Sequence, residues 1–270
     1  MRIEIDDDFD LHKIDISGQC FRVNDFAEGL YRFVHRDNVL YIRRICEGTY
    51  DVDCDLNTWT DVWHPYFDLD RNYRRIRESI PKEDVFMREA AEDGAGIRIL
   101  RQDPFEMIIS FIISQRKSIP AIRTSIELIC RRYGTPVTTP YEKLYLFPAP
   151  SILAQATVDE LRECKLGYRV PYILDAARRV ADRVLVPDDL YALPDEALFE
   201  TLLTVKGIGR KVANCICLFA YSRTAMVPVD TWIAQIIEHE YNGRNAFLDY
   251  GNVGGIMQQY AFYHYRPSRD

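Results

Sequence analysis

The 270-residue sequence contains no long hydrophobic run. No stretch of 18 or more apolar residues occurs, which argues against a membrane-spanning helix. The first ten residues are acidic, so they resemble neither a secretory signal peptide nor a transit peptide. We therefore expect a cytoplasmic protein with no membrane partner.

Cysteine motifs are also missing. The seven cysteines include no Cys-x-x-Cys pair, and none follows Cys217. Their odd number and wide scatter indicate reduced thiols, and they argue against a disulfide framework or a zinc knuckle.

The sequence has no excess of positive charge, because its net charge is −7. This balance is unfavourable for a nucleic-acid partner, since attraction to phosphates usually requires a basic surface. Basic residues do cluster at 71–77, 116–117, 131–132 and 178–179. Each cluster can equally be a solvated helix face, so the charge distribution leaves the choice open.

The residue pattern of the sequence changes near Pro65. Before it, residues 19–23, 30–34 and 39–45 are rich in β-branched and aromatic side chains and separated by turn residues, which predicts strands. After it, apolar residues recur at helical spacing. Helices are predicted around 105–113 and 122–130, and at 83–93, 158–164, 171–184, 195–205, 210–221, 230–240 and 252–265.

These elements predict an α+β fold. A small N-terminal antiparallel β-sheet domain is expected over residues 1–68, followed by a mostly α-helical body over residues 69–270. The body is expected to contain two helical subdomains, and its C-terminal helix to pack back near the functional site.

The segment from Leu202 to Ile216 is the most informative part of the sequence. One amphipathic helix ends near Lys206, Gly207 and Gly209 bracket an apolar residue, and a second helix starts at once. Glycines allow a sharp turn, and the start of the second helix presents free N–H groups to an anion. The pattern is typical of a helix-hairpin-helix that grips a DNA phosphate without reading sequence. An ordinary αα-hairpin, which often contains glycine, is the alternative.

Lys211 lies in the first turn of the second predicted helix. The helix dipole disfavours a positive charge there, which favours the neutral amine that a nucleophile needs. Cys215 lies four residues further along, on the same helix face. Asp230 precedes the next predicted helix, where it can serve as the N-cap. From these local features alone, a solvated lysine and a plain cap are equally acceptable.

Longer stretches carry a family resemblance. Lys206-Gly-Ile-Gly-Arg-Lys-Val-Ala-Asn-Cys-Ile, followed by Val227-Pro-Val-Asp, resembles the helix-hairpin-helix-Gly-Pro-Asp glycosylase superfamily, and the lysine at 211 points to its bifunctional members. Four further stretches are similar to 8-oxoguanine DNA glycosylases. They are Ser17-Gly-Gln-Cys-Phe-Arg, Tyr66-Phe-Asp-Leu-Asp, Ile99-Leu-Arg-Gln-Asp-Pro and Leu166-Gly-Tyr-Arg. The resemblance covers nearly the whole chain, so the body is expected to be a helix-hairpin-helix glycosylase body.

This resemblance implies a bifunctional DNA glycosylase and AP lyase that flips 8-oxoguanine out of duplex DNA and excises it. Lys211 would attack C1′ of the damaged nucleotide and form a Schiff base, and β-elimination would then nick the strand. Asp230 would stabilise positive charge developing on the sugar and help to orient the lysine.

A base pocket is implied as well, because the target must leave the duplex. Gly18 matches a glycine whose carbonyl accepts a hydrogen bond from N7–H of 8-oxoguanine and repels the N7 acceptor of guanine. Cys215 matches the residue against one face of the flipped base, Gln258 the residue at its edge, and Phe262 the residue against its other face. A spacing of four places Gln258 and Phe262 on one helix face. Without the resemblance, core packing would be favoured for Phe262.

Contacts to the rest of the DNA are also implied. Gln115 and Arg116 are expected to fill the vacated stack, and Tyr168 and Arg169 match a helix-breaking wedge and its neighbour. Ala121 stands where the animal enzymes have an arginine that reads the opposite cytosine. We therefore expect a relaxed preference for the opposite base.

No cofactor is expected. The iron–sulfur members of the superfamily carry four closely spaced cysteines after the aspartate, and this chain has none beyond Cys217. The carbonyls of Lys206 and Gly209 are the expected place for a structural cation that bridges to phosphate. Trp232 replaces the histidine usually found two residues past the aspartate, a departure that affects phosphate contacts there. We expect a monomer that acts on double-stranded DNA containing oxidised guanine and, in a prokaryote, associates with the nucleoid.

Two other functions fit parts of the sequence. A monofunctional glycosylase for alkylated purines or mismatched adenine is disfavoured by Lys211, because such members activate water instead. A non-catalytic DNA-binding module has no need for a lysine, a cysteine and an aspartate at family spacing.

Overall fold

The computed structural model describes residues 1–27 and 29–265. They form two compact units, each assembled from segments distant in sequence. Of the described residues, unit 1 comprises 1–27, 29–33, 39–101 and 222–265, and unit 2 comprises 34–38 and 102–221. The sequence-based division into domains 1–68 and 69–270 stays a prediction.

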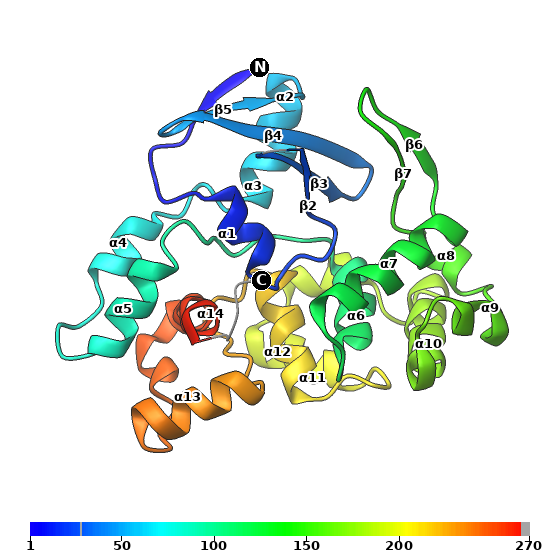
Figure 1. Ribbon diagram of the computed structural model, residues 1–270. Coiled ribbons are helices and arrows are strands. Elements are labelled where there is room, and N and C mark those ends of the chain that lie inside the picture. The colour runs from blue at the N-terminus through cyan, green and yellow to red at the C-terminus, as the bar shows by residue number, and fades with distance from the viewer. Residues whose placement is uncertain (28, 266–270) are drawn as a thin grey trace. The chain divides into compact units, whose positions relative to one another are not determined.

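The first part of unit 1 is a five-stranded antiparallel sheet in the order β1-β5-β4-β3-β2 (Figure 1). The strands are β1 (Arg2–Glu4), β2 (Asn24–Ala27), β3 (Leu30–His35), β4 (Asn38–Cys46) and β5 (Thr49–Val52). Helix α1 (Leu11–Ile16) separates β1 from β2. After β5 come α2 (Leu56–Thr58), a π-helical turn η1 (Trp59–Trp63) and α3 (His64–Tyr66).

An aromatic core joins the sheet to these short helices. Phe33 and Leu40 from the strands are fully buried in one cluster with Trp63 and Phe67. The rings of Phe33 and Phe67 meet edge to face, with centroids 5.0 Å apart. Each fully buried side chain of this size contributes about 1.5–3 kcal/mol through burial, so this cluster holds the sheet to the chain that follows it.

The remaining helices of unit 1 come from both ends of the chain. They are α4 (Tyr73–Glu78), α5 (Val85–Asp93), α13 (Thr231–Tyr241), the 3-10 helix η4 (Ala246–Val253) and α14 (Gly254–Tyr265). Helix α14 packs against α5, η4 and α13. Gly251 has φ 55° and interrupts η4, which explains why the single helix predicted over 252–265 begins only at Gly254.

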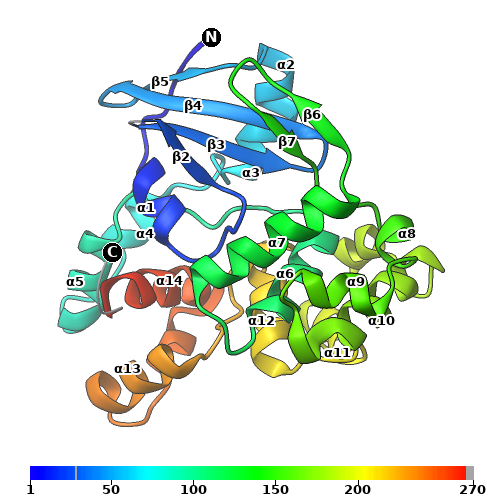
Figure 2. The ribbon, with the colours of Figure 1, turned by 45° about the vertical axis from the view of Figure 1, so that its right-hand side comes forward.

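Unit 2 is mostly helical (Figure 2). Its elements are α6 (Pro104–Ser114), α7 (Ile119–Tyr133), β6 (Pro136–Thr138), β7 (Lys143–Tyr145), α8 (Pro150–Leu153), α9 (Val158–Glu163), η2 (Gly167–Arg169), α10 (Val170–Ala181), η3 (Pro187–Ala192), α11 (Asp195–Leu203) and α12 (Arg210–Phe219). Residues 104–113 of α6 are all buried, and this helix contacts α7, α10 and α12. It is therefore the central helix of the unit.

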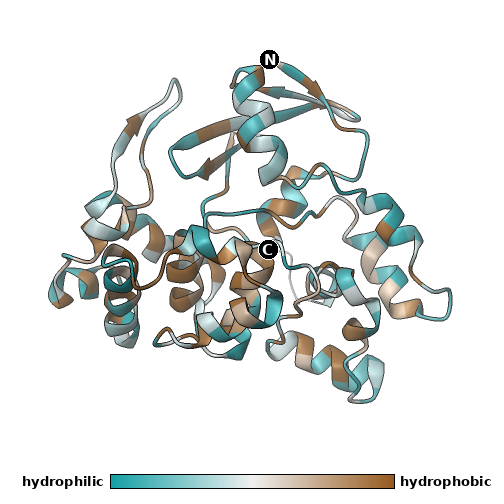
Figure 3. Ribbon diagram, turned by 180° about the vertical axis from the view of Figure 1, so that it is seen from behind, coloured by the Kyte–Doolittle hydropathy of each residue, from teal (hydrophilic) through white to brown (hydrophobic). Residues whose placement is uncertain are grey.

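The predicted α+β class is confirmed, and brown and teal segments alternate along many elements, as expected where one face is buried (Figure 3). The strand predicted over residues 19–23 is wrong, because this segment is a series of bends with buried side chains, and β2 starts only at Asn24. The β6–β7 hairpin was not predicted. All seven cysteines are described, and none forms a disulfide. Among the described helices, none is long and apolar enough to cross a membrane.

Candidate DNA-processing site

The predicted hairpin is present in unit 2 between α11 and α12. Gly207 has φ +84°, a conformation that favours glycine, and Gly209 is the N-cap of α12. The apolar residues Val205 and Ile208 are buried, which anchors the turn. No side chain caps α12, so the N–H groups of its first turn remain available to an anion. Whether the carbonyls of Lys206 and Gly209 bind a cation stays a prediction.

Lys211 lies in the first turn of α12, as predicted, and is half-buried. Its Nζ atom is 5.9 Å from the ring centroid of Phe111 on α6, and that ring stacks on Phe219 at 5.6 Å. Cys215 follows one turn later and is buried. The amine thus lies near the face of an aromatic ring, directly after the hairpin turn.

The α6–α7 loop and the segment Gly167–Arg169 form a second part of unit 2. Arg116 is exposed, with φ 52°. Tyr168 is 53% exposed, whereas Arg169 is only 6% exposed and its guanidinium lies 4.4 Å above the Tyr168 ring. Lys117 links the two parts, because its Nζ donates to the Lys165 carbonyl at 2.8 Å. Burial, Arg169 and Lys165 lower the pKa of Lys117.

In unit 1, Gly18 lies in a turn that is held from two sides. Its φ is +82°. On one side, the amide nitrogen of fully buried Gln19 donates to the Ser17 hydroxyl at 3.0 Å and to the Arg98 carbonyl at 2.8 Å. On the other, Gln259 of α14 donates to the Ser17 carbonyl at 2.7 Å. The residues on both sides of Gly18 are therefore held in place by hydrogen bonds.

Helix α14 brings two predicted pocket residues to the same unit as Gly18. Gln258 is buried, and its Oε1 has no hydrogen-bond partner among the described residues. A buried acceptor without a partner is unfavourable unless water or a ligand satisfies it. Phe262 lies one turn further and is half-buried. Asp230 caps α13, because its Oδ1 accepts from the Ile233 N–H at 2.9 Å, which confirms the predicted N-cap.

The predicted residues fall into two sets. Gly18, Asp230, Gln258 and Phe262 belong to unit 1. The others belong to unit 2: Lys211, Cys215, Gln115, Arg116, Tyr168, Arg169, Lys206, Gly207 and Gly209.

Residues that support these two sets were missed from the sequence. Gln19 and Gln259 hold the Gly18 turn, and Tyr172 packs on the hairpin. No short-range spacing signals such partners; the side-by-side glutamines at 258 and 259 were the only hint.

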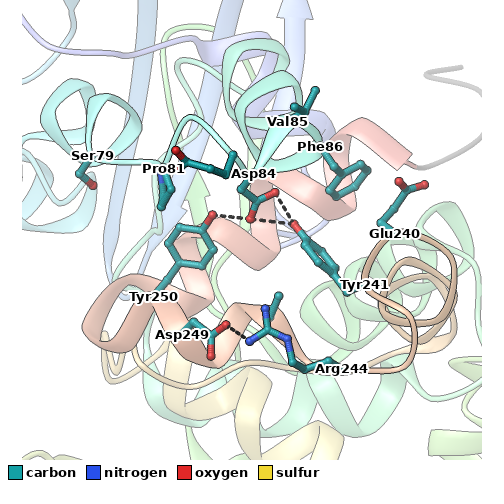
Figure 4. Close-up of a pocket in the computed structure, with 12 residues that line it drawn as sticks. Ser79, Pro81, Asp84, Val85, Phe86, Glu240, Tyr241, Arg244, Asp249 and Tyr250 are labelled. Carbon is teal, nitrogen blue, oxygen red and sulfur yellow. Dashed lines mark hydrogen bonds and ion pairs between the residues drawn. The ribbon is translucent and has the colours of Figure 1, made fainter.

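A groove of about 690 Å³ in unit 1 contains none of the predicted residues. Its centre is Asp84, the N-cap of α5, whose carboxylate accepts from the hydroxyls of Tyr241 at 3.0 Å and Tyr250 at 2.6 Å (Figure 4). Burial and the nearby carboxylate raise the pKa of both tyrosines. These hydrogen bonds tie α5 to the end of α13 and to η4, so the groove has a structural explanation.

The fold and the hairpin are those of base excision repair proteins. Residues 109–246 match the HhH-GPD superfamily base excision DNA repair protein, and residues 2–108 match the N-terminal domain of 8-oxoguanine DNA glycosylase. The chain therefore belongs to the HhH-GPD superfamily and, within it, to the 8-oxoguanine DNA glycosylase family.

Relatives from three organisms agree with this assignment. A probable N-glycosylase/DNA lyase of Methanothermobacter thermautotrophicus is 32% identical over 215 residues, 69% of this chain and 69% of that protein. The N-glycosylase/DNA lyase of Saccharomyces cerevisiae is 32% identical over 190 residues, 65% of this chain and 50% of the yeast protein. The 8-oxoguanine glycosylase/lyase of Clostridium acetobutylicum in its apo-form is 31% identical, with a TM-score of 0.91 over 98% of this chain and 95% of that one.

Proposed function

We propose that this chain excises 8-oxoguanine from double-stranded DNA and then cleaves the strand as a lyase, with Lys211 as the nucleophile. The observation that carries the proposal is the place of Lys211: in the first turn of α12, one turn before buried Cys215 and directly after an uncapped helix-hairpin-helix turn. A helix start that binds phosphate would hold the sugar of the same nucleotide near that amine.

The reaction requires one attack and one elimination. The Lys211 amine nitrogen forms a bond to C1′ while the bond from C1′ to the base breaks, and the base leaves with the electron pair. Opening of the sugar ring gives a Schiff base, and loss of a C2′ proton then expels the 3′ phosphate. Asp230 is assigned the stabilisation of positive charge on the sugar, a role compatible with its N-cap hydrogen bond to Ile233.

Base selection is assigned to the Gly18 turn and α14. The Gly18 carbonyl would accept from N7–H of 8-oxoguanine and oppose the unprotonated N7 of guanine. The fixed orientation of this turn supports such a role, because one hydrogen bond discriminates only if its acceptor cannot rotate away. The unpartnered Oε1 of Gln258 would accept from the edge of the base, and Phe262 would cover one face. Cys215 is assigned the other face.

Trapping with borohydride tests this function. Wild-type protein incubated with a duplex containing 8-oxoguanine and borohydride should form a covalent protein–DNA adduct, and Lys211→Gln should form none. Lys143→Gln is the matched control, since Lys143 is exposed on β7 and has no assigned role. It should retain the adduct.

The other outcomes distinguish the alternatives. Excision of the base without an adduct would contradict the lysine mechanism and favour a monofunctional glycosylase. Binding of the duplex without excision would contradict catalysis altogether and favour a DNA-binding module. An adduct that persists in Lys211→Gln would assign the nucleophile to another amine.

We also propose a relaxed preference for the base opposite the lesion, because Ala121 has no donor with which to read cytosine. The Clostridium acetobutylicum relative has been solved with double-stranded DNA containing cytosine opposite 8-oxoG, with a TM-score of 0.90 at 31% identity. For this chain, single-turnover excision opposite C, A, G and T should give similar rates. A preference for C above roughly 100-fold, the value of a good bidentate base contact, would contradict the proposal.

A further inference from the structure

Gln115 forms hydrogen bonds to the hairpin and to the segment Gly167–Arg169, and both of these are expected to contact DNA. Its side-chain amide donates to the Gly207 carbonyl in the hairpin at 3.0 Å and to the Ile112 carbonyl at 3.1 Å. Its main-chain carbonyl accepts from the guanidinium of Arg169, next to the wedge Tyr168. One residue at the end of α6 thus joins the hairpin to the wedge.

Aromatic contacts complete the connection by a second route. A Cβ atom on Gly207 would lie 2.6 Å from Cγ of Tyr172, so this ring packs directly on the hairpin backbone. The Tyr172 ring meets the Tyr168 ring edge to face at 6.4 Å, and Arg169 covers Tyr168 at 4.4 Å. Gln115, Gly207, Tyr172, Tyr168 and Arg169 therefore form a closed circuit of contacts within unit 2.

Burial of Arg169 shows how tightly this circuit is packed. The residue is 6% exposed, and its guanidinium also donates to the Leu166 carbonyl at 3.2 Å. Tyr168 is the member that projects to solvent, at 53% exposure. A projecting ring on a buried, hydrogen-bonded support is held in one orientation before DNA arrives. Groups that are already ordered bind more tightly, because their ordering cost is not incurred on binding.

We propose that Gln115 is a positioning residue that fixes the wedge Tyr168 at a set place relative to the hairpin, so that the two engage DNA together. The inference rests on the proposed function in DNA. It replaces the void-filling role predicted for Gln115, because the amide group that would fill the vacated stack is already bonded to the hairpin. Arg116, which is exposed, is left for that role.

A double-mutant cycle tests the proposal. The variants are Gln115→Met, which keeps the side-chain length and removes the donor, Tyr168→Ala, and the two combined. The probe is a duplex with a tetrahydrofuran abasic-site analogue, which cannot be processed, and the reference is the same duplex without damage. Gln115→Met should weaken binding to the tetrahydrofuran duplex about 5- to 10-fold, the value of one hydrogen bond. Binding to the undamaged duplex should change less than about 2-fold, because the hairpin grip is retained.

The effect should depend on the wedge. In the Tyr168→Ala background, Gln115→Met should cost less than about 2-fold, because no wedge remains to be positioned. Equal losses in both backgrounds would overturn the proposal. The matched control is Gln155→Met, since the Gln155 amide makes a similar bond to the Ser151 carbonyl at 3.0 Å and Gln155 is not a member of the circuit. This control should leave both affinities unchanged.

A second variant keeps the proposal testable if Gln115→Met does not fold. In Gln115→Glu the ionised carboxylate opposes the Gly207 carbonyl, whereas the protonated carboxyl can donate to it. The affinity of this variant for the tetrahydrofuran duplex, relative to wild type, should therefore rise as the pH falls from 7 to about 5. A ratio that does not change with pH would overturn the proposal. Wild-type protein that does not prefer the tetrahydrofuran duplex would overturn the proposed function as well, whereas normal adduct trapping with additive losses would overturn this inference alone.

Discussion

The Arg98 guanidinium donates five hydrogen bonds within unit 1, and removing it should destabilise that unit. The side chain is completely buried. Its guanidinium donates to the carbonyls of Phe67, Asp68 and Arg71 at 2.6–2.9 Å. It also donates to the carboxylate of Asp7 at 3.0 Å and to a neighbouring carbonyl at 2.7 Å. The fork thus ties the N-terminal segment to the chain that leaves the aromatic core.

The expected loss can be worked from these five acceptors. In Arg98→Met, the carbonyl of Phe67 stays buried without a donor, at about 1–3 kcal/mol, and the carbonyl of Asp68 keeps only the N–H of Arg71. The other three acceptors are partly buried and recover some hydration from water. The partly buried Asp7 carboxylate also loses its ion pair, which adds to this cost. We expect about 5 kcal/mol in total, a large share of the 5–15 kcal/mol typical of native proteins.

Urea unfolding followed by tryptophan fluorescence measures this loss, because Trp59 and Trp63 lie in the core of unit 1. With a slope of about 3 kcal/mol per M, the midpoint should fall by about 1.5 M. Arg98→Lys keeps the charge but offers at most three donors. Its urea midpoint should therefore lie between those of the wild type and Arg98→Met. Arg131→Met is the control, since its exposed pair with Glu127 is worth at most about 0.5 kcal/mol. A midpoint for Arg98→Met within 0.3 M of wild type, about a fifth of the expected shift, would refute the reasoning.

Three further predictions concern single contacts. Gly207→Ala should lower the free energy of unfolding by about 1–3 kcal/mol, because φ is +84° and the new methyl would collide with Tyr172. Thermal unfolding measures this change, and an unchanged melting midpoint would contradict the prediction. Asp84→Ala should cost about 2–4 kcal/mol, because a cap and the acceptor of two tyrosine hydroxyls are lost together, while Asp84→Asn should lose less. The Thr157 N–H and hydroxyl and a nearby arginine lower the pKa of Glu160 to about 2, so its stabilisation is present above 4.5 and lost as the pH falls toward 2. An NMR titration of Glu160 should show a higher midpoint in Thr157→Ala, and an equal midpoint would refute this cause.

Periodicity predicted those elements of the fold that bury one face. Helices α5, α10 and α12 start and end within a few residues of the predicted ranges. The strand predicted directly after Gly18 was wrong because the segment makes distant contacts. Gln19 uses both ends of its amide on partners about 80 residues away, among them the N–H of Leu100 at 2.8 Å. Such distant bonds replace a strand ladder, and nothing in a local window of sequence indicates them.

In the candidate site, too, only the residues with a local sequence pattern could be predicted. Lys211, Cys215 and the hairpin glycines have fixed spacing along one turn and one helix, so their pattern is visible in the sequence. Gln259 acts on a turn 242 residues away. The ring of Tyr172 packs against the backbone at Gly207. Residues that act through tertiary contacts carry no such pattern and emerged only from the structure.

The discontinuous construction of unit 1 has a consequence for the order in which the chain folds on a ribosome. Residues 102–221, with the hairpin, the wedge and Lys211, are contiguous and complete unit 2 with only the earlier segment 34–38. The Gly18 turn must wait for α14, which is synthesised more than 200 residues later. Domains form as soon as their own residues are available. Lys211, the proposed nucleophile, therefore has its support while the turn proposed to select the base is still without its last partner.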